Sequence, residues 1–109
     1  MTPEGKVKES VKRLLIKKDC YYFFPMQNGL GRTGIPDIIG CIPTVITPDM
    51  VGKTIGQFLA VETKAPGRLR NVTPNQEREL KAIAEKGGIA VLADDVSIVE
   101  DALNKPPCG

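Results

Sequence analysis

Two carboxylates and a lysine in this chain have the spacing that a metal-dependent hydrolytic site requires. Asp37 ends a Gly-Ile-Pro-Asp motif, and Glu62 and Lys64 stand at the end of the apolar run Phe58–Val61. Carboxylate oxygens are hard ligands for a divalent ion, and such an ion can activate water against a phosphodiester. Lys64 can supply a cation for the charge that develops in the transition state. These residue types point to phosphodiester hydrolysis.

Glu62 and Lys64 are two residues apart, so on a strand their side chains point to the same face. The apolar run before them predicts a central strand that is covered on both faces. Ionised groups at the end of such a strand need partners, because burying an unpaired charge is costly. An ion pair between Glu62 and Lys64 with no further role is the purely structural explanation, and it stays open at this point.

Asp37 adds a second carboxylate. Pro36 cannot donate to a strand ladder, so it places Asp37 at the start of a strand, Asp37–Ile42. If this strand forms a hairpin with the next one, Asp37 lies opposite Glu62. Facing carboxylates repel unless one is protonated or a cation lies between them. A divalent ion between the two carboxylates is the simplest way to remove this repulsion. The ammonium group of Lys64, without a metal ion, is the alternative.

The composition narrows the chemistry further. The chain has 109 residues, three cysteines and no histidine, which fits one domain over residues 1–109 and excludes histidine-based triads and most zinc sites. The odd cysteine count without a C-x-x-C pair favours reduced thiols and a cytoplasmic location. No apolar run approaches the roughly 18 residues that span a bilayer, so no membrane association is expected.

The charge is unevenly distributed along the chain. Residues 1–76 carry eleven Lys and Arg against six Asp and Glu, whereas residues 77–109 carry four against seven. The basic part contains the predicted site, which favours a polyanionic partner. Arg32, Arg68 and Arg70 fall in predicted loops that flank the site, and they are candidates for contacts with a nucleic-acid backbone. Plain surface positions are the alternative for each of them.

Periodicity and capping signals predict an α/β fold with a mixed sheet flanked by helices. In chain order the predicted elements are a helix from Thr2 to about Asp19, strands Cys20–Phe24, Asp37–Ile42 and Phe58–Lys64, a helix from Thr73 to Gly87-Gly88, strand Ile89–Ala93, and a helix from Asp94 or Asp95 to about Asn104. The long connection 43–56 between the second and third of these strands is either a substrate-gripping flap or a dimer contact.

These motifs together resemble a known family. The sequence G-I-P-D, a strand, E-T-K after an apolar run and a glutamine on the next helix are similar to the PD-(D/E)XK nuclease superfamily. The stretches T-P-E-G-K-V-K and N-G-L-G-R-T-G-I-P-D resemble more specifically the small stand-alone VRR-NUC nucleases of phages and prophages. The resemblance runs from residue 2 to about residue 93, and it implies a restriction-endonuclease-like αβββαβ core.

The resemblance also implies roles for the residues. Asp37, Glu62 and the backbone carbonyl of Thr63 would bind Mg²⁺ or Mn²⁺, and Lys64 would orient the attacking water and stabilise the pentavalent phosphate. Gln76 would contact the site from its helix. A capping-box role at the start of that helix is the alternative for Gln76, and the two roles are compatible.

An acid from the first helix belongs to the family's pattern as well. Glu4 matches it best and would hold a bound water or a second ion, with Glu9 as the second candidate. The alternative for Glu4 is an acid that the helix dipole favours. Lys6 is a candidate for a phosphate contact, although it also suits a solvated helix face.

These features predict a metal-dependent endonuclease that hydrolyses DNA. The resemblance implies branched or junction DNA as substrate, a homodimer, and the host cytoplasm as location for a phage-encoded protein. A nucleic-acid-binding accessory protein of a phage recombination or replication complex, which keeps the fold without cutting, is the alternative. A purely structural domain is the third possibility, and it leaves two acids and a lysine at strand ends without a purpose.

Overall fold

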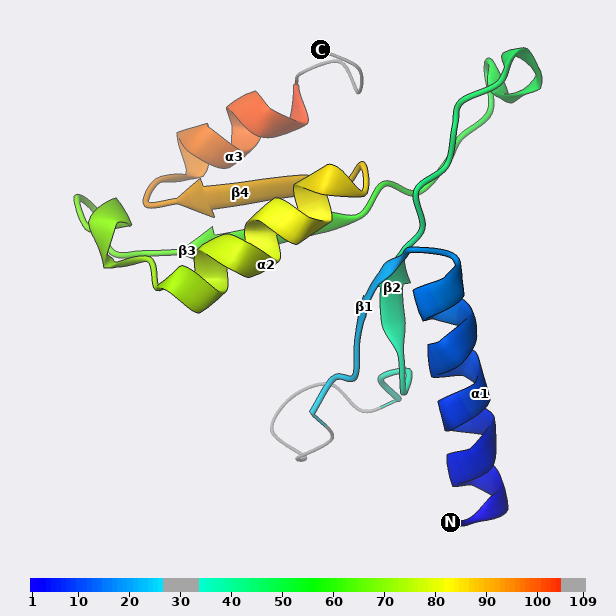
Figure 1. The fold of residues 1–109 in the computed structure, drawn as a ribbon. Helices are drawn as coiled ribbons and strands as arrows, with labels where there is room; N and C mark the ends of the chain where they lie inside the picture. The colour runs from blue at the N-terminus through cyan, green and yellow to red at the C-terminus, as the bar shows by residue number, and fades with distance from the viewer. Residues whose placement is uncertain (27–33, 105–109) are drawn as a thin grey trace. The chain divides into compact units, whose positions relative to one another are not determined.

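The computed structural model describes residues 1–26 and 34–104 (Figure 1). The chain divides into two compact units, Met1–Thr44 and Val45–Gly109, and each is described by itself. Three α-helices and four strands follow one another in the predicted order within these residues. The chain is therefore an α/β protein. No helix within the described ranges is long and apolar enough to cross a membrane.

The first unit begins with helix α1 (Pro3–Lys17). Its N-cap is Thr2, whose hydroxyl oxygen accepts a hydrogen bond of 2.9 Å from the backbone N–H of Gly5. Proline at the first helical position loses nothing, since its missing N–H would have no intrahelical partner there. The helix ends at Lys18, and the chain then turns through Asp19 with a φ of 55°. The predicted helix is confirmed.

Strands β1 (Tyr21–Phe23) and β2 (Ile39–Cys41) form an antiparallel pair in this unit. Cys41 is only 7% exposed. The strand that was predicted to begin at Asp37 begins at Ile39, and Asp37 lies in a bend before it. Pro36 therefore lies within the loop that precedes β2 and does not open the strand.

In the second unit, strands β3 (Leu59–Thr63) and β4 (Ile89–Ala93) are paired in parallel. Glu62 lies opposite Leu92 in this register. Parallel neighbours need a crossover connection, and helix α2 (Pro74–Glu85) provides it. Both strands were predicted to within one residue at each end.

Helix α2 starts with a capping box. The Thr73 hydroxyl accepts a hydrogen bond of 3.1 Å from the Gln76 N–H, and Oε1 of Gln76 accepts one of 3.0 Å from the Thr73 N–H. This reciprocal pair satisfies two backbone donors at the helix end. The helix ends at Lys86, and Gly87 follows with a φ of 89°, which favours glycine. The predicted start and end signals are confirmed.

Helix α3 (Val96–Leu103) completes the second unit. Figure 1 shows α2 and α3 on the two sides of β4. Among the residues described in this unit, the buried apolar side chains are Ile83, Val91 and Ala93, each 4 to 6% exposed. The core of the unit therefore lies where the helices cover β4.

Within its own unit, strand β3 is covered unevenly. Leu59 and Val61 remain 44% and 39% exposed, whereas Ala60 and Glu62, which alternate with them, are half-buried. The elements of its own unit thus cover one face of β3. Cover of the second face would come from outside this unit, so the predicted cover of both faces stays a prediction. Helix α2 contacts β4 more than β3, and helix α3, on the other side of the sheet, packs against β4.

Two expectations concern both units together. A hairpin between β2 and β3 and a single domain over residues 1–109 each require a defined arrangement of the two units, so both stay predictions. The connection 43–56 runs across the boundary between the units and contains a short 3₁₀ helix, Pro48–Met50. Its role as a flap or as a dimer contact also stays open.

Candidate active site

Glu62 and Lys64 lie next to each other at the carboxyl end of β3. Nζ of Lys64 is 3.9 Å from Oε2 of Glu62, and the side chains of the lysine and the glutamate keep 16% and 33% of their surface exposed. Opposite charges attract more strongly when water is partly excluded. The pair is therefore shielded but still accessible to a ligand.

Gln76 contacts Lys64 from helix α2. Its Oε1 accepts a hydrogen bond of 3.0 Å from Nζ of Lys64, in addition to the one from the backbone of Thr73. An amide oxygen has two lone pairs, so it can accept both. The capping box and the contact with the site, which were alternatives in the sequence, are both present. Because the cap fixes the Gln76 side chain, it also fixes the position of the lysine ammonium group.

The backbone of Lys64 extends the sheet beyond β3. Its N–H donates a hydrogen bond of 2.9 Å to the carbonyl of Ala93, the last residue of β4. Since the strands are parallel, their carboxyl ends lie at one edge of the sheet, which is where ligands bind in open α/β sheets. Glu62 and Lys64 stand at this edge.

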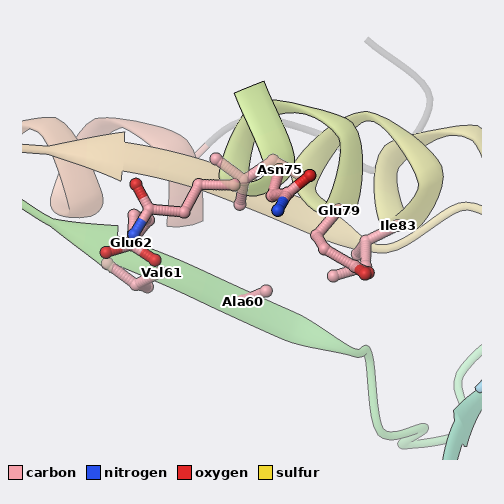
Figure 2. A pocket seen from close by; sticks show the side chains of 8 residues that line it. Ala60, Val61, Glu62, Asn75, Glu79 and Ile83 are labelled. Atoms are coloured by element: carbon pink, nitrogen blue, oxygen red, sulfur yellow. The ribbon is translucent and has the colours of Figure 1, made fainter. Parts of the chain in front are cut away.

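A pocket of about 250 Å³ lies between β3 and α2, beside Glu62 (Figure 2). Figure 2 shows Glu62 on the strand and Glu79 on the helix at different places along this pocket. A ligand held by Glu62 would therefore have space next to it within the second unit. The lining residues are Ala60, Val61, Glu62, Asn75, Gln76, Glu79, Leu80 and Ile83.

Asp37 belongs to the first unit. Its Oδ2 is 4.0 Å from Nζ of Lys8 on α1, and the two side chains are about half exposed. An ion pair this open to water contributes little stability. The meeting of Asp37 with Glu62 would join the two units, so it stays a prediction.

The residues singled out on α1 differ in exposure. Glu4 and Lys6 are exposed, whereas Glu9 is half-buried. Glu4 stands in the first turn, where a negative charge interacts favourably with the helix dipole. All three lie in the first unit, and their participation in the site stays a prediction.

Arg68 and Arg70 lie on the connection between β3 and α2. Arg68 precedes the 3₁₀ helix Leu69–Asn71, which contains Arg70, and both residues are exposed. Within residues 1–26 and 34–104, their guanidinium groups make no hydrogen bond or ion pair. These donors are therefore available to a ligand. Arg32 lies outside the described residues.

Two residues with contacts near the predicted site residues were not identified from the sequence. Lys8 was assigned only to the basic exterior of its helix, and Asp94 was considered only as a helix cap. The cap of α3 is Asp95, which accepts a hydrogen bond of 3.0 Å from the Ser97 N–H. Asp94 instead accepts one of 2.8 Å from the N–H of Gly67. Gly67 and Asp94 are 27 residues apart, and no local sequence pattern reveals a contact between residues so far apart in the chain.

The donors at the end of β3 suit a hard divalent ion. Glu62 offers a carboxylate and Thr63 a backbone carbonyl, and Mg²⁺ prefers such oxygen ligands. Within the described part of the chain, no three Asp, Glu, Cys or His residues are grouped closely enough to hold a metal. The remaining predicted ligand, Asp37, belongs to the other unit. The donors of the second unit thus fit a divalent ion in their chemistry, and Asp37 as a further ligand stays a prediction.

Comparison with known families gives one match. The model of a family described as the VRR-NUC domain matches residues 8–95, which include parts of both units. The matched range contains Asp37, Glu62, Lys64 and Gln76 and excludes Glu4. No curated protein and no solved structure matches the chain.

Proposed function

We propose that this chain, which belongs to the VRR-NUC family of nucleases, is a metal-dependent endonuclease that hydrolyses phosphodiester bonds in DNA. A restriction-endonuclease-like fold agrees with its mixed α/β structure. The observation that carries the proposal is the position of Lys64, held between the carboxylate of Glu62 and the amide oxygen of Gln76 at the carboxyl edge of the sheet.

In this proposal Asp37, Glu62 and the backbone carbonyl of Thr63 hold Mg²⁺ or Mn²⁺. A bound divalent ion lowers the pKa of water and polarises a phosphoryl oxygen. Glu62 is suited to this role because its carboxylate is partly exposed beside an open pocket. Lys8 partly neutralises Asp37 in the first unit.

Lys64 would stabilise the charge that develops on the phosphate. An ammonium group has three N–H donors. One donates to Gln76, and another faces Glu62 at 3.9 Å. The third is available to a phosphate oxygen or to the attacking water. Because the side chain is already held, little reorganisation is needed when the transition state forms.

The remaining candidate residues would bind the DNA backbone, a water molecule or a second ion. Arg68, Arg70, Arg32 and Lys6 would contact backbone phosphates, since phosphate contacts position a protein on DNA. Glu4 would hold a water molecule or a second ion. The family match begins after Glu4 and Lys6, so their roles rest on the resemblance of the stretch T-P-E-G-K-V-K.

A branched substrate, a homodimer and a phage origin are finer proposals that rest on the resemblance described above. Two active sites in a dimer could cut two strands of a branched substrate. Sedimentation of the purified protein at high micromolar concentration tests the dimer, and a monomer under those conditions contradicts it.

The test of the function is cleavage of end-labelled single-stranded, duplex, flap and four-way-junction DNA in Mg²⁺, Mn²⁺ or EDTA. We expect cutting with a metal ion and none in EDTA. The variants Glu62→Ala and Lys64→Ala should each lose cutting by at least about 100-fold, as is typical when one stabilising group is removed.

Matched controls come from the exposed side of α2. Glu77→Ala and Lys81→Ala remove the same charges from the same unit, and both residues are exposed. They should leave cutting within about twofold, because surface substitutions away from a site have small effects. Tight DNA binding without cutting of any substrate would instead support the non-cleaving accessory protein.

A further inference from the structure

The connection from β3 to α2 is a loop that the site itself closes. Lys64 and Gln76 are 12 residues apart, and their side chains share a hydrogen bond. The two ends of the connection therefore lie together. Compact surface loops of about 6–16 residues with neighbouring ends are frequently functional.

Local hydrogen bonds shape this loop. The N–H of Arg68 donates to the carbonyl of Ala65 at 2.9 Å, and the N–H of Asn71 donates to the carbonyl of Arg68 at 2.9 Å. Gly67 lies in the first of these turns with a φ of 77°, which side chains disfavour. These bonds all lie within the loop, so they fix its shape but do not attach it to the sheet.

Asp94 provides the attachment. Its Oδ2 accepts the N–H of Gly67 at 2.8 Å, a distance typical of a bond to a charged acceptor. Asp94 directly follows Ala93, whose carbonyl accepts the N–H of Lys64. One strand end therefore holds both the lysine of the site and the tip of the loop that begins with it.

We infer that Asp94 is a positioning residue for DNA binding, which holds the loop of residues 65–71 so that Arg68 and Arg70 bind backbone phosphates next to the one at Lys64. The inference rests on the proposed function. Both arginines are exposed, and neither side chain has a partner in the described part of the chain. Fixing the loop beforehand reduces the ordering entropy that binding must overcome.

The sign of the effect distinguishes positioning from simple charge. Asp94 is negative, so if it acted only through its charge, its removal would strengthen binding to a polyanion. If Asp94 positions the loop, Asp94→Ala should instead weaken DNA binding. Asp94→Asn should lose no affinity, because the amide oxygen of Asn can accept the same hydrogen bond from Gly67.

The experiment measures binding of a fluorescent duplex in EDTA at several salt concentrations. We expect Asp94→Ala to weaken binding about fivefold, equivalent to the loss of roughly one hydrogen bond. Its affinity should also depend less on salt, since fewer phosphates are contacted. The matched control is Asp95→Ala, which removes the neighbouring carboxylate from the cap of α3 and should bind DNA like the wild type.

A double-mutant cycle tests whether Asp94 affects DNA binding through the two arginines. On a background lacking both arginines, Asp94→Ala should cause no further loss of affinity, whereas general destabilisation would lower affinity on both backgrounds. In Mg²⁺, Asp94→Ala should raise KM and leave kcat nearly unchanged. If Asp94→Ala does not fold, Asp94→Ser, whose hydroxyl is too short for this bond, takes its place.

Each outcome decides the inference. Unchanged or tighter binding by Asp94→Ala, or an equal loss in Asp95→Ala, overturns it. Failure of the wild type to cut any DNA contradicts the proposed function instead, and the binding measurements in EDTA still test the role of Asp94.

Discussion

The ammonium group of Lys64 and the backbone N–H of Thr73 donate to one and the same oxygen, Oε1 of Gln76, each at 3.0 Å. The first contact belongs to the site and the second to the cap of α2. The orientation of the lysine and the start of the helix therefore depend on a single side chain. Mutations can separate these two functions, because Thr73 takes part only in the cap.

Gln76→Ala should affect both stability and cutting, whereas Thr73→Ala should affect stability alone. Each variant removes part of the capping box and should lower the free energy of unfolding by about 1 kcal/mol. Only Gln76→Ala also leaves Lys64 without its acceptor, and we expect cutting to fall about tenfold or more. Urea unfolding and cleavage rates measure the two effects. An equal loss of cutting in Thr73→Ala would contradict the positioning of Lys64 by Gln76.

Metal binding should stabilise the folded protein. An ion that binds only the folded state raises its stability by about 2.7 kcal/mol at 100 times its Kd. We expect Mn²⁺ to raise the Tm of the wild type, and Asp37→Ala and Glu62→Ala to abolish the rise. Asp101→Ala removes an exposed carboxylate from α3 and should keep it. A rise that survives in Glu62→Ala would exclude this residue as a ligand.

Lys8 should weaken the binding of a cation at Asp37. Its ammonium group lies 4.0 Å from the carboxylate, a separation at which two charges in water interact by about 1 kcal/mol. We therefore expect Lys8→Met to bind Mn²⁺ up to about fivefold more tightly by calorimetry. Lys12→Met removes the next lysine on the same side of α1 and serves as the control. Equal changes in both variants would indicate a general effect of charge.

The cap of α3 should make stability depend on acid pH. The Ser97 hydroxyl, and then its backbone N–H, donate to Asp95 and lower the pKa of its carboxyl from 3.8. A pKa that is lower in the folded state stabilises the fold above the unfolded value, and this contribution is lost as the pH falls through the folded value. Asn caps helices about as well as Asp but does not titrate.

The measurement for this prediction compares wild type with Asp95→Asn. Between about pH 5 and pH 2, the wild type should lose more free energy of unfolding than the variant in urea titrations. Thr47 similarly lowers the pKa of Asp49, but Asp49 is present in both proteins and its effect cancels. Identical pH profiles would show that Asp95 does not contribute.

A side chain at Gly88 should destabilise the fold. A Cβ at this position would lie 2.7 Å from Cγ2 of Ile83 and 3.3 Å from the carbonyl oxygen of Phe58. Ile83 is 4% exposed and cannot move aside easily. We expect Gly88→Ala to cost about 1–3 kcal/mol, as is typical of overpacking. Gly56→Ala is the control, because a Cβ at Gly56 would meet nothing within 4 Å. Equal stability of the two variants would contradict this packing.

Much of the fold could be predicted from local patterns. The Thr73 to Gln76 capping box, the glycine after α2 and the strand Ile89–Ala93 all agree with the structure. Alternation along β3 is sufficient to place Glu62 and Lys64 on one side of the strand. These features depend on residues within a few positions of one another, so the sequence suffices.

Predictions that depended on more distant packing were less reliable. The start of β2 was placed at Asp37 instead of Ile39, and of the two faces of β3 that the sequence predicts to be covered, its own unit covers one. Where a strand begins depends on its pairing partner, and coverage depends on which strand a helix packs against. Neither is encoded in the local pattern of apolar residues.

The sequence by itself determined which residue types could do the chemistry, and it placed Glu62 on β3 and Gln76 on α2, where the structure has them. Only the tertiary structure decided that Gln76 serves the cap and Lys64 together, and that Asp94 holds Gly67 while Asp95 caps α3. The reason is physical. Capping and alternation arise within one element, whereas these contacts form only after the parallel pairing of β3 and β4 brings together segments that are far apart in the chain.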